Sequence, residues 1–268
     1  MVVFPNAKIN IGLNIINKRP DGFHNIETIF YPIGLSDALE FIESPTLDLT
    51  ITGQLIEGNI ENNLVVKTFR LLQKDYKLPE IKIHLHKAIP SGAGLGGGSS
   101  DAAFMLCELN KHFQLGLSIE QLKEYAAKLG SDCAFFVDNT PSFAHGRGEL
   151  LEKIDVNIRK KHILLVKPNV HVSTAEAYRG VKPSLPVHSL KKLISQPLEN
   201  WKHSIVNDFE KSIFPNHPVI EKIKVQLYEM GAIYASMSGS GSSVYGIFNE
   251  NIEHSHTFAD CFIWKGEI

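Results

Sequence analysis

Alternating apolar and polar positions predict a β-hairpin near the start of the chain. Apolar side chains occupy every second position from residue 9 to residue 15, which is the spacing of a half-buried strand. Lys8 and Asn10 would then share the face opposite the isoleucines. Arg19-Pro-Asp-Gly22 has the composition of a turn, and residues 23–31 are expected to form the returning strand.

Strands and helices are expected to alternate through the rest of the first 155 residues. Each is predicted from the period of its apolar positions, and Ser118-Ile-Glu-Gln121 adds a capping box that begins a helix. In chain order the predicted elements are one or two strands over 37–52, a loop over 53–63, a helix over 64–76, a strand from residue 81, a helix through 102–113 and a helix over 118–129 that ends at Gly130.

In residues 156–268 the apolar positions again follow a strand period in some stretches and a helix period in others. This predicts a second α+β domain after a first one over residues 1–155. Gly146-Arg-Gly-Glu149 is expected to form a turn close to this boundary. The predicted elements are a strand over 163–166, a short helix over 173–178, an irregular stretch over 179–200 with a helical piece near Leu190, a helix over 219–230 and a strand over 244–248.

Composition narrows the class of protein. The net charge of the 268 residues is −2, so no broad basic surface for nucleic acid or an acidic membrane is expected. No run approaches the about 20 apolar residues of a membrane span, and the first residues lack the basic and apolar regions of a signal peptide. The three cysteines have no metal-ligand spacing, and with an odd count they fit a reduced cytoplasmic protein. The sequence leaves a monomer or a weak dimer open.

A glycine-rich loop carries the strongest functional signal. Five glycines fall between Gly92 and Gly98, after a strand pattern and before a helix pattern. Glycine lets the backbone approach a ligand closely, and the N-terminus of a helix offers free N–H groups to phosphate oxygens. A flexible linker is the alternative interpretation, but linkers are rarely held between two strongly patterned elements. We therefore interpret the loop as a phosphate site.

Three common phosphate loops do not fit. A P-loop requires a lysine after the glycines, and none follows here. A dinucleotide-binding fold requires a strand that ends in an acidic residue about 20 residues further on, whereas the sequence predicts a second helix there. A protein kinase requires H-R-D and D-F-G motifs, which are absent from the sequence.

The stretch from Pro90 to Ala103, P-x-G-x-G-L-G-G-G-S-S-D-A-A, resembles the nucleotide-binding motif of the GHMP kinases, the superfamily of galactokinase, homoserine kinase, mevalonate kinase and phosphomevalonate kinase. The resemblance implies that the loop wraps the triphosphate of ATP at a helix that begins near Ser99. It also implies Mg²⁺, with the hydroxyl of Ser99 or Ser100 as a possible ligand. The implied ATP-binding residues are Asn63, Pro90, Ser91, Gly92, Ala93, Gly94, Leu95, Gly96, Gly97, Gly98, Ser99 and Ser100.

Two further motifs of the superfamily occur in the expected order. Pro5-x-Ala7-Lys8-x-Asn10 lies on the first predicted strand, and Ser238-Gly-Ser-Gly241 lies near the end of the chain. By itself the second stretch could be a simple hairpin turn or a loop that closes on phosphates from another side. The resemblance assigns it to the phosphate side of the site through Ser238, Gly239, Ser240 and Gly241.

Shorter stretches resemble one family within the superfamily, the 4-diphosphocytidyl-2-C-methyl-D-erythritol kinases of non-mevalonate isoprenoid (terpenoid) biosynthesis. One of them is Arg19-Pro-Asp-Gly-Phe-His24, and its part Asp21-Gly-Phe-His24 is the discriminating element, because it resembles the cytosine-recognition site of that family. The other stretches are Ala7-Lys-Ile-Asn-Ile-Gly-Leu13, Gly130-Ser-Asp-Cys-Ala-Phe-Phe136, Gly146-Arg-Gly-Glu149 and Asn207-Asp-Phe-Glu210.

This resemblance implies an ATP-dependent phosphotransferase that acts on the 2-hydroxyl of 4-diphosphocytidyl-2-C-methyl-D-erythritol. Asp132 would accept the hydroxyl proton and Lys8 would offset charge, the two meeting beside the loop. An aspartate of pKa about 3.9 is a weak base, which suffices when the phosphoryl transition state is loose. Taken alone, Asp132 could equally be a helix N-cap. The implied substrate-binding residues are Asn10, Phe23, His24, Lys87, Asp132 and Thr174, with Phe23 stacked on cytosine.

The resemblance also implies the fold, an α+β two-domain GHMP kinase fold. Its N-terminal domain would be like domain 2 of ribosomal protein S5, its C-terminal domain would be ferredoxin-like, and the active site would lie in the cleft between them. The chain departs from the family at Phe23, where tyrosine is frequent, and at Ala134, where proline is frequent. Another GHMP kinase, of homoserine or mevalonate type, and a non-catalytic ATP-binding regulator are the alternative functions.

Overall fold

The computed structural model describes residues 1–54, 59–252 and 257–268. The chain forms two compact units, and each is assembled from separate stretches. The first comprises Met1–Ala7, Leu35–Ser91 and Gly96–Thr140, and the second comprises Lys8–Gly34, Gly92–Leu95 and Pro141–Ile268. The middle of the glycine loop therefore belongs to the second unit and its two ends to the first. The domain boundary near residue 155, which divides the chain along its sequence, stays a prediction.

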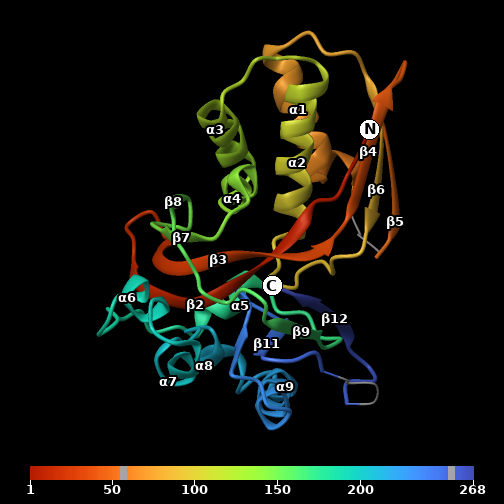
Figure 1. Cartoon of the computed structure of the whole chain (residues 1–268). Helices are drawn as coiled ribbons and strands as arrows, with labels where there is room; N and C mark the ends of the chain where they lie inside the picture. The colour runs from red at the N-terminus through yellow and green to blue at the C-terminus, as the bar shows by residue number, and fades with distance from the viewer. Residues whose placement is uncertain (55–58, 253–256) are drawn as a thin grey trace. The chain divides into compact units, whose positions relative to one another are not determined.

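The first unit contains a four-stranded sheet in the order β1-β4-β6-β5. β5 and β6 are parallel neighbours, so the chain must cross over between them, and this connection includes helix α1. Figure 1 shows α1 next to α2 on one side of the sheet. The bounds are β1 Val2–Val3, β4 Ala38–Glu43, β5 Asp48–Gly53, β6 Ile81–Lys87, α1 Leu64–Asp75 and α2 Gly97–His112.

Local sequence explains these elements. Side chains of β6 alternate strictly between buried and exposed, as its period predicts. Asn63 caps α1, and Ser118 and Gln121 form the complete capping box of helix α3 (Ile119–Leu129). The loop predicted over 53–63 contains a short 3₁₀ turn at Ile60–Asn62, while its residues 55–58 lie outside the described residues. The unit ends with helix α4 (Cys133–Asp138).

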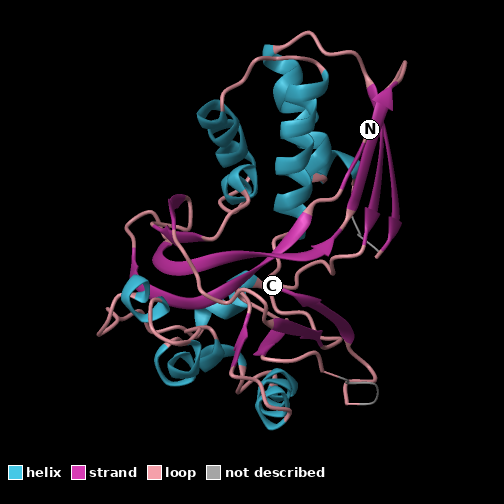
Figure 2. Ribbon diagram, in the orientation of Figure 1, coloured by secondary structure: helices cyan, strands magenta, loops and turns pink. Residues whose placement is uncertain are grey.

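The second unit contains two four-stranded sheets, in the orders β2-β3-β7-β8 and β10-β11-β9-β12. Figure 2 shows their strands in magenta. The turn at 146–149 connects β7 to β8. The bounds are β2 Asn6–Lys18, β3 His24–Ser36, β7 Ser142–His145, β8 Leu150–Lys153, β9 His162–Lys167, β10 Tyr234–Met237, β11 Val244–Phe248 and β12 Phe262–Glu267.

The prediction that the first strand is half-buried is wrong. β2 is buried on both faces from Ala7 to Leu13, and Lys8 is only 3% exposed. The polar face is covered because Gly94 and Ser238, which are distant in sequence, hydrogen-bond to it. Period-2 alternation assigns residues to faces correctly but does not say what covers each face.

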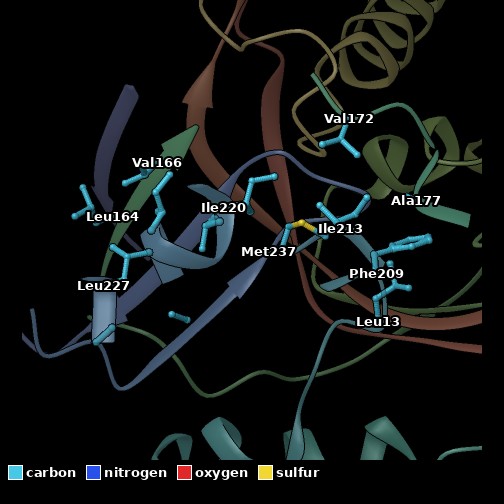
Figure 3. Close-up of a cluster of buried hydrophobic side chains, with 14 of the residues drawn as sticks. Leu13, Leu164, Val166, Val172, Ala177, Phe209, Ile213, Ile220, Leu227 and Met237 are labelled. Atoms are coloured by element: carbon cyan, nitrogen blue, oxygen red, sulfur yellow. The ribbon is translucent and has the colours of Figure 1, made fainter. Parts of the chain in front are cut away.

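Short helices and a shared hydrophobic core complete the second unit. In Figure 3, Ile220 and Leu227 of helix α9 lie in one cluster with Leu164 and Val166 of β9 and with Met237. The irregular stretch predicted over 179–200 includes the expected helical piece near Leu190. The helices are α5 Thr174–Arg179, α6 Leu190–Ile194, α7 Trp201–Ser204, α8 Glu210–Ile213 and α9 Pro218–Glu229, with a 3₁₀ turn at Leu198–Asn200.

Sheets with mainly antiparallel pairing, together with helices, confirm the α+β class. Within the described ranges, no helix is long and apolar enough to cross a membrane. The three cysteines, Cys107, Cys133 and Cys261, are free thiols.

Candidate functional site

Lys8 is hydrogen-bonded to the middle of the glycine loop. Its Nζ donates to Asn10 Oδ1 at 2.6 Å and to the carbonyl oxygen of Gly94 at 3.1 Å. Its backbone N–H donates to the carbonyl oxygen of Leu95 at 3.0 Å, and Nζ also lies 4.9 Å from the ring centre of Phe30. The ammonium group is therefore held at a fixed place beside the loop, where it can offset negative charge on a phosphoryl group.

The second glycine–serine loop packs directly against the first. It is the turn between β10 and β11, and its Ser238 Oγ donates to the carbonyl oxygen of Gly94 at 2.9 Å. A Cβ atom at Gly94 would lie 2.0 Å from the carbonyl oxygen of Ser238, and the φ of Gly94 is +76°. Only glycine satisfies both conditions. The turn thus serves as a hairpin connection and also forms a second wall beside the predicted phosphate loop.

Asn10 supports this junction from within the protein. Its backbone N–H donates to Ser238 Oγ at 3.2 Å, and its side-chain Nδ2 donates to Thr28 Oγ1 at 2.9 Å. The hydroxyl of Tyr245 donates to the Asn10 carbonyl oxygen at 2.8 Å. The side-chain amide of Asn10 therefore has a partner at each end: its oxygen accepts from Lys8 and its nitrogen donates to Thr28. Contact between Asn10 and a substrate stays a prediction.

The residues that hold the second glycine–serine loop have no individual role in the predicted site. Asn207 is buried, and its Nδ2 donates to the carbonyl oxygens of Met237 and Gly239, each at 2.8 Å. Glu210 accepts from the backbone N–H of Met237 at 2.9 Å and from Lys224 Nζ at 2.6 Å. The sequence singles out Asn207-Asp-Phe-Glu210 only as one of the stretches that resemble the family. No local pattern predicts this role, because the Met237 carbonyl oxygen that Asn207 binds lies 30 positions away in the sequence.

The predicted substrate residues Phe23 and His24 have different neighbours, a cation for Phe23 and an aromatic ring for His24. The His24 ring stacks on Tyr178 at 4.7 Å between ring centres with 19° between planes. Phe23 is 56% exposed, and the Arg147 guanidinium carbon lies 5.1 Å from its ring centre. An exposed flat ring beside a cation suits a planar base that carries phosphate. Tyr178 and Arg147 were not predicted as site residues, because neither belongs to the motif that contains Phe23 and His24.

Partial burial lowers the pKa of His24 below its ordinary value, and the charge of Lys18 lowers this pKa further. The ring therefore stays neutral to a lower pH than an ordinary histidine. A neutral imidazole can both donate and accept a hydrogen bond, which is what recognition of a base edge requires.

The segment from Val170 to Thr174 borders both glycine loops. Thr174 Oγ1 lies 3.4 Å from Ser240 Oγ, and Ser242 Oγ donates to the carbonyl oxygen of Val170 at 2.8 Å. His171 Nδ1 lies 3.1 Å from the position that a Cβ atom would take at Gly92. His171 was not predicted as a site residue, because it is an isolated histidine outside every motif.

The two ends of the glycine loop belong to the first unit and lead into α2. The helix begins at Gly97, two positions before the start that the resemblance implied, and Gly96 precedes it with a φ of +71°. No side chain caps this helix, so its first N–H groups can bind an anion. The predicted residues Gly97, Gly98 and Ser99 form its first turn.

The hydroxyl groups at this helix start are suited to a hard cation. Ser100 is buried, and its Oγ has no hydrogen-bond partner among the described residues. Within the described ranges, no cluster of three or more acidic, histidine or cysteine side chains could hold a metal. Mg²⁺ usually takes few protein ligands and binds phosphate oxygens as well, so Ser99 and Ser100 stay the predicted hydroxyl ligands.

Asp132 stands at the N-cap position of α4, which is the alternative role that the sequence left open for it. Its side chain makes no capping hydrogen bond. It is half-buried and accepts from Ser131 Oγ at 3.3 Å. Ala134, where the family often has proline, lies within α4. Asp132 belongs to the first unit and Lys8 to the second. That the two side chains meet stays a prediction.

Two other predicted site residues, Asn63 and Lys87, form hydrogen bonds or ion pairs within the first unit. Asn63 Oδ1 accepts from the N–H of Val65 at 3.0 Å and so caps α1. Lys87 is 3% exposed, and its ammonium forms ion pairs with Asp37 and Asp101. Contacts of Asn63 with nucleotide and of Lys87 with substrate stay predictions.

Comparison with known proteins shows to which class of protein the fold belongs. The family model "GHMP kinases N terminal domain" matches residues 63–147, and "GHMP kinases C terminal" matches residues 188–254. The fold is similar to a crystal structure of 4-(cytidine 5'-diphospho)-2C-methyl-D-erythritol kinase, with a TM-score of 0.81, 28% identity and coverage of 99% of this chain and 98% of that one. A homoserine kinase from Cytophaga hutchinsonii, at 15% identity, a TM-score of 0.68 and coverage of 98% and 95%, shares the fold. The chain has the fold of the GHMP kinases.

The relatives narrow this class to one family. The protein of Bacteroides thetaiotaomicron called 4-diphosphocytidyl-2-C-methyl-D-erythritol kinase is 54% identical over 100% of both chains. The Porphyromonas gingivalis protein of the same name is 44% identical, also over 100% of both chains. The chain belongs to the family of the 4-diphosphocytidyl-2-C-methyl-D-erythritol kinases, and the two-domain GHMP kinase fold that the sequence implied is confirmed.

Proposed function

We propose that the chain transfers the γ-phosphoryl group of ATP to the 2-hydroxyl of 4-diphosphocytidyl-2-C-methyl-D-erythritol, in isoprenoid precursor biosynthesis. The observation that carries this proposal is the hydrogen-bonded junction of Lys8, Gly94 and Ser238, in a chain 54% identical to a relative of that name. Solved homoserine and mevalonate kinases with 15–18% identity share only the fold, so no observation favours those substrates.

In this reaction the substrate hydroxyl oxygen forms a bond to the γ-phosphorus while the bond from that phosphorus to the ADP oxygen breaks. The hydroxyl proton passes to Asp132, and Lys8 offsets the negative charge on the transferred group. Little proton removal is needed early in a loose transition state, so positioning is the larger contribution. This assignment requires that both side chains reach the same hydroxyl in the complex with substrates.

ATP is the phosphoryl donor of this family, and we place its phosphates on the glycine loop from Pro90 to Ser100. The loop N–H groups and the start of α2 provide donors without a side-chain charge. Mg²⁺ would be held by the phosphates and the hydroxyl of Ser99 or Ser100, and when bound it neutralises part of the phosphate charge. Ser238 to Gly241 would border the phosphates, and Asn63 would contact the nucleotide.

On the acceptor side, Phe23 would stack on the cytosine and His24 would hydrogen-bond its edge. Arg147 lies close enough to the Phe23 ring to attract the diphosphate that follows the base. Asn10 and Thr174 are the remaining proposed substrate contacts. The substrate is a small molecule, and the free thiols fit a reducing cytoplasm.

A substrate panel tests the proposal. ADP release should be rapid with ATP, Mg²⁺ and 4-diphosphocytidyl-2-C-methyl-D-erythritol, and near background with homoserine, mevalonate or the same polyol without its cytidine diphosphate. Faster turnover of homoserine or mevalonate would assign the chain another activity in the superfamily. ATP binding without turnover of any alcohol would indicate a regulator instead of an enzyme.

A further inference from the structure

A buried cluster of three charged side chains lies at the base of the glycine loop. Lys87 ends β6 just before the loop, Asp101 lies on α2 just after it, and Asp37 precedes β4. Lys87 Nζ donates to Asp101 Oδ2 at 2.7 Å and to Asp37 Oδ2. The three residues are between 1% and 3% exposed. We name this group the loop-base cluster, and all of it lies in the first unit.

The cluster also fixes the backbone where the loop begins. Asp37 Oδ1 accepts from the N–H groups of Ala88 and Ile89, at 2.6 and 2.8 Å. The carbonyl oxygen of Lys87 accepts from the N–H of Gln54 at 2.8 Å. One aspartate thus binds the loop's first residues and the lysine side chain together, so neither can move without breaking charge-assisted hydrogen bonds.

The other end of the loop is held by the same lysine. A Cβ atom at Gly97 would lie 2.9 Å from Ile89 Cγ2 and 3.3 Å from Lys87 Nζ. The first turn of α2 therefore rests on Ile89 and on the lysine ammonium. Because Lys87 also bonds to Asp101 in the next turn, it joins the residue before the loop to the helix after it.

Burying these charges carries a desolvation cost that the packing of apolar side chains would avoid. A buried ion pair is often no more stabilising than well-packed apolar residues, so fold stability alone gives little reason for one here. Asp101 Oδ1 is buried with no hydrogen-bond partner among the described residues, which adds to the cost. The advantage of such a cluster is a single geometry, since each bond is directional.

We propose that the loop-base cluster holds the two ends of the glycine loop at the separation that ATP phosphates require, and that Lys87 is a positioning residue for ATP rather than a contact for the cytidine substrate. This inference depends on the proposed role of the loop in binding ATP. It replaces the substrate contact that the family resemblance implies for Lys87, because two carboxylates already surround its ammonium.

The first test changes Asp101 and leaves Lys87 paired with Asp37. Asp101→Leu removes the bond between the two ends of the loop. It keeps the buried ion pair of Lys87 with Asp37, whose net charge is zero, so the unit should fold. Its dissociation constant for a non-hydrolysable ATP analogue, measured by calorimetry, should rise about tenfold, as loss of a charge-assisted hydrogen bond allows. Asp101→Asn, which can still accept from Lys87, should restore most of the affinity.

The matched control is Asp48→Asn, on the same sheet. Asp48 pairs with Lys82 at 3.6 Å on an exposed surface, so the variant should bind the analogue as the unaltered chain does. A tenfold loss in this control as well would show that affinity responds to any change in the sheet, and it would overturn the inference.

The second test separates the two roles of Lys87. Lys87→Met alone leaves two buried carboxylates without a cation, so the double variant Lys87→Met with Asp101→Leu is preferable. A positioning role predicts a raised KM for ATP similar to that of Asp101→Leu and an unchanged KM for the cytidine substrate. A KM for the cytidine substrate that rises tenfold in the double variant but not in Asp101→Leu would show direct contact and overturn the inference.

Failure of the inference and failure of the proposed function give different results. Unaltered analogue affinity in Asp101→Leu overturns the role of the cluster and leaves the enzyme activity as proposed. Absence of analogue binding in the unaltered chain overturns the proposed function, and this inference with it. Lack of turnover with the cytidine substrate overturns only the substrate, because analogue binding is measured without it.

Discussion

The hydroxyl of Ser238 donates a 2.9 Å hydrogen bond to the carbonyl oxygen of Gly94, across 144 positions of sequence. The same carbonyl oxygen accepts from Lys8 Nζ. One backbone atom of the glycine loop thus joins the lysine of the first motif to the serine of the last. These three motifs, which the sequence shows only in order, meet at a single point, and that point is where we place the phosphates.

Replacing Gly94 with alanine should damage ATP binding more than backbone strain alone explains. A side chain at a positive φ costs about 1–2 kcal/mol, and the new Cβ atom would also meet the carbonyl oxygen of Ser238 at 2.0 Å. Thermal unfolding and calorimetry with an ATP analogue measure both effects. Gly116→Ala is the matched control, since its φ is +73° and nothing lies within 4 Å. Equal destabilisation by the two variants, with equal ATP affinity, would contradict the steric argument.

Lys8→Met should lower kcat by about 100-fold or more, because it removes the charge that offsets the phosphoryl group while it keeps the side-chain length. Asp132→Asn should lower kcat by a similar factor through loss of the proton acceptor. Single-turnover kinetics with saturating ATP measure the chemical step directly. Analogue binding should persist in Asp132→Asn. Full activity in either variant would remove that residue from the proposed mechanism.

Asn207→Ala should destabilise the fold by about 2–3 kcal/mol, because two buried carbonyl oxygens lose their donor. These oxygens belong to Met237 and Gly239, so the KM for ATP should also rise as the second loop loosens. Urea unfolding and steady-state kinetics check the two effects. Asn216→Ala, whose exposed amide donates at 3.4 Å to Ser212, should change neither. A stable Asn207→Ala with normal kinetics would refute the supporting role.

The affinity for the cytidine substrate should depend on pH through His24. Its pKa lies below the ordinary 6.5, first because of desolvation and then because of Lys18. The ring is therefore more than half neutral at pH 6.5, and affinity should level off above that pH and fall at lower pH as the ring gains a proton and loses its acceptor nitrogen. Calorimetry between about pH 5 and 8 covers this titration range.

Lys18→Gln provides the control for this pH dependence. Removing the positive charge makes protonation of His24 easier, so its pKa should rise and the loss of affinity should begin at a higher pH. The affinity at pH 8 should be unchanged. A pH dependence that is identical in the two proteins would show that another group controls it.

Local chemistry was sufficient for elements whose signals are close in sequence. The alternation of β6, the capping box at Ser118 and Gln121, and the turn after Arg19 are all present where the sequence predicts them. Such signals can be read because a period or a cap depends on residues within about one or two turns of chain. The glycine loop could be placed between a strand and a helix for the same reason.

The short strands β7, β8 and β12 and the short helices α7 and α8 could not be predicted. Each spans only four to six residues, so any local pattern in it is weak. Their stability comes from pairing and packing with distant segments, as in the pairing of β12 with β9. Tertiary contacts routinely override weak local preference in such stretches.

The sequence by itself determined the family, the order of the motifs and which residues carry the candidate chemistry, because long motifs keep their spacing within one stretch of chain. Only the tertiary structure decided that Lys8 is buried, that Asn207 holds the second loop, and that Lys87 sits between two carboxylates. The physical reason is that burial and hydrogen bonding depend on what lies against a side chain. Those neighbours come from parts of the chain that no local period connects.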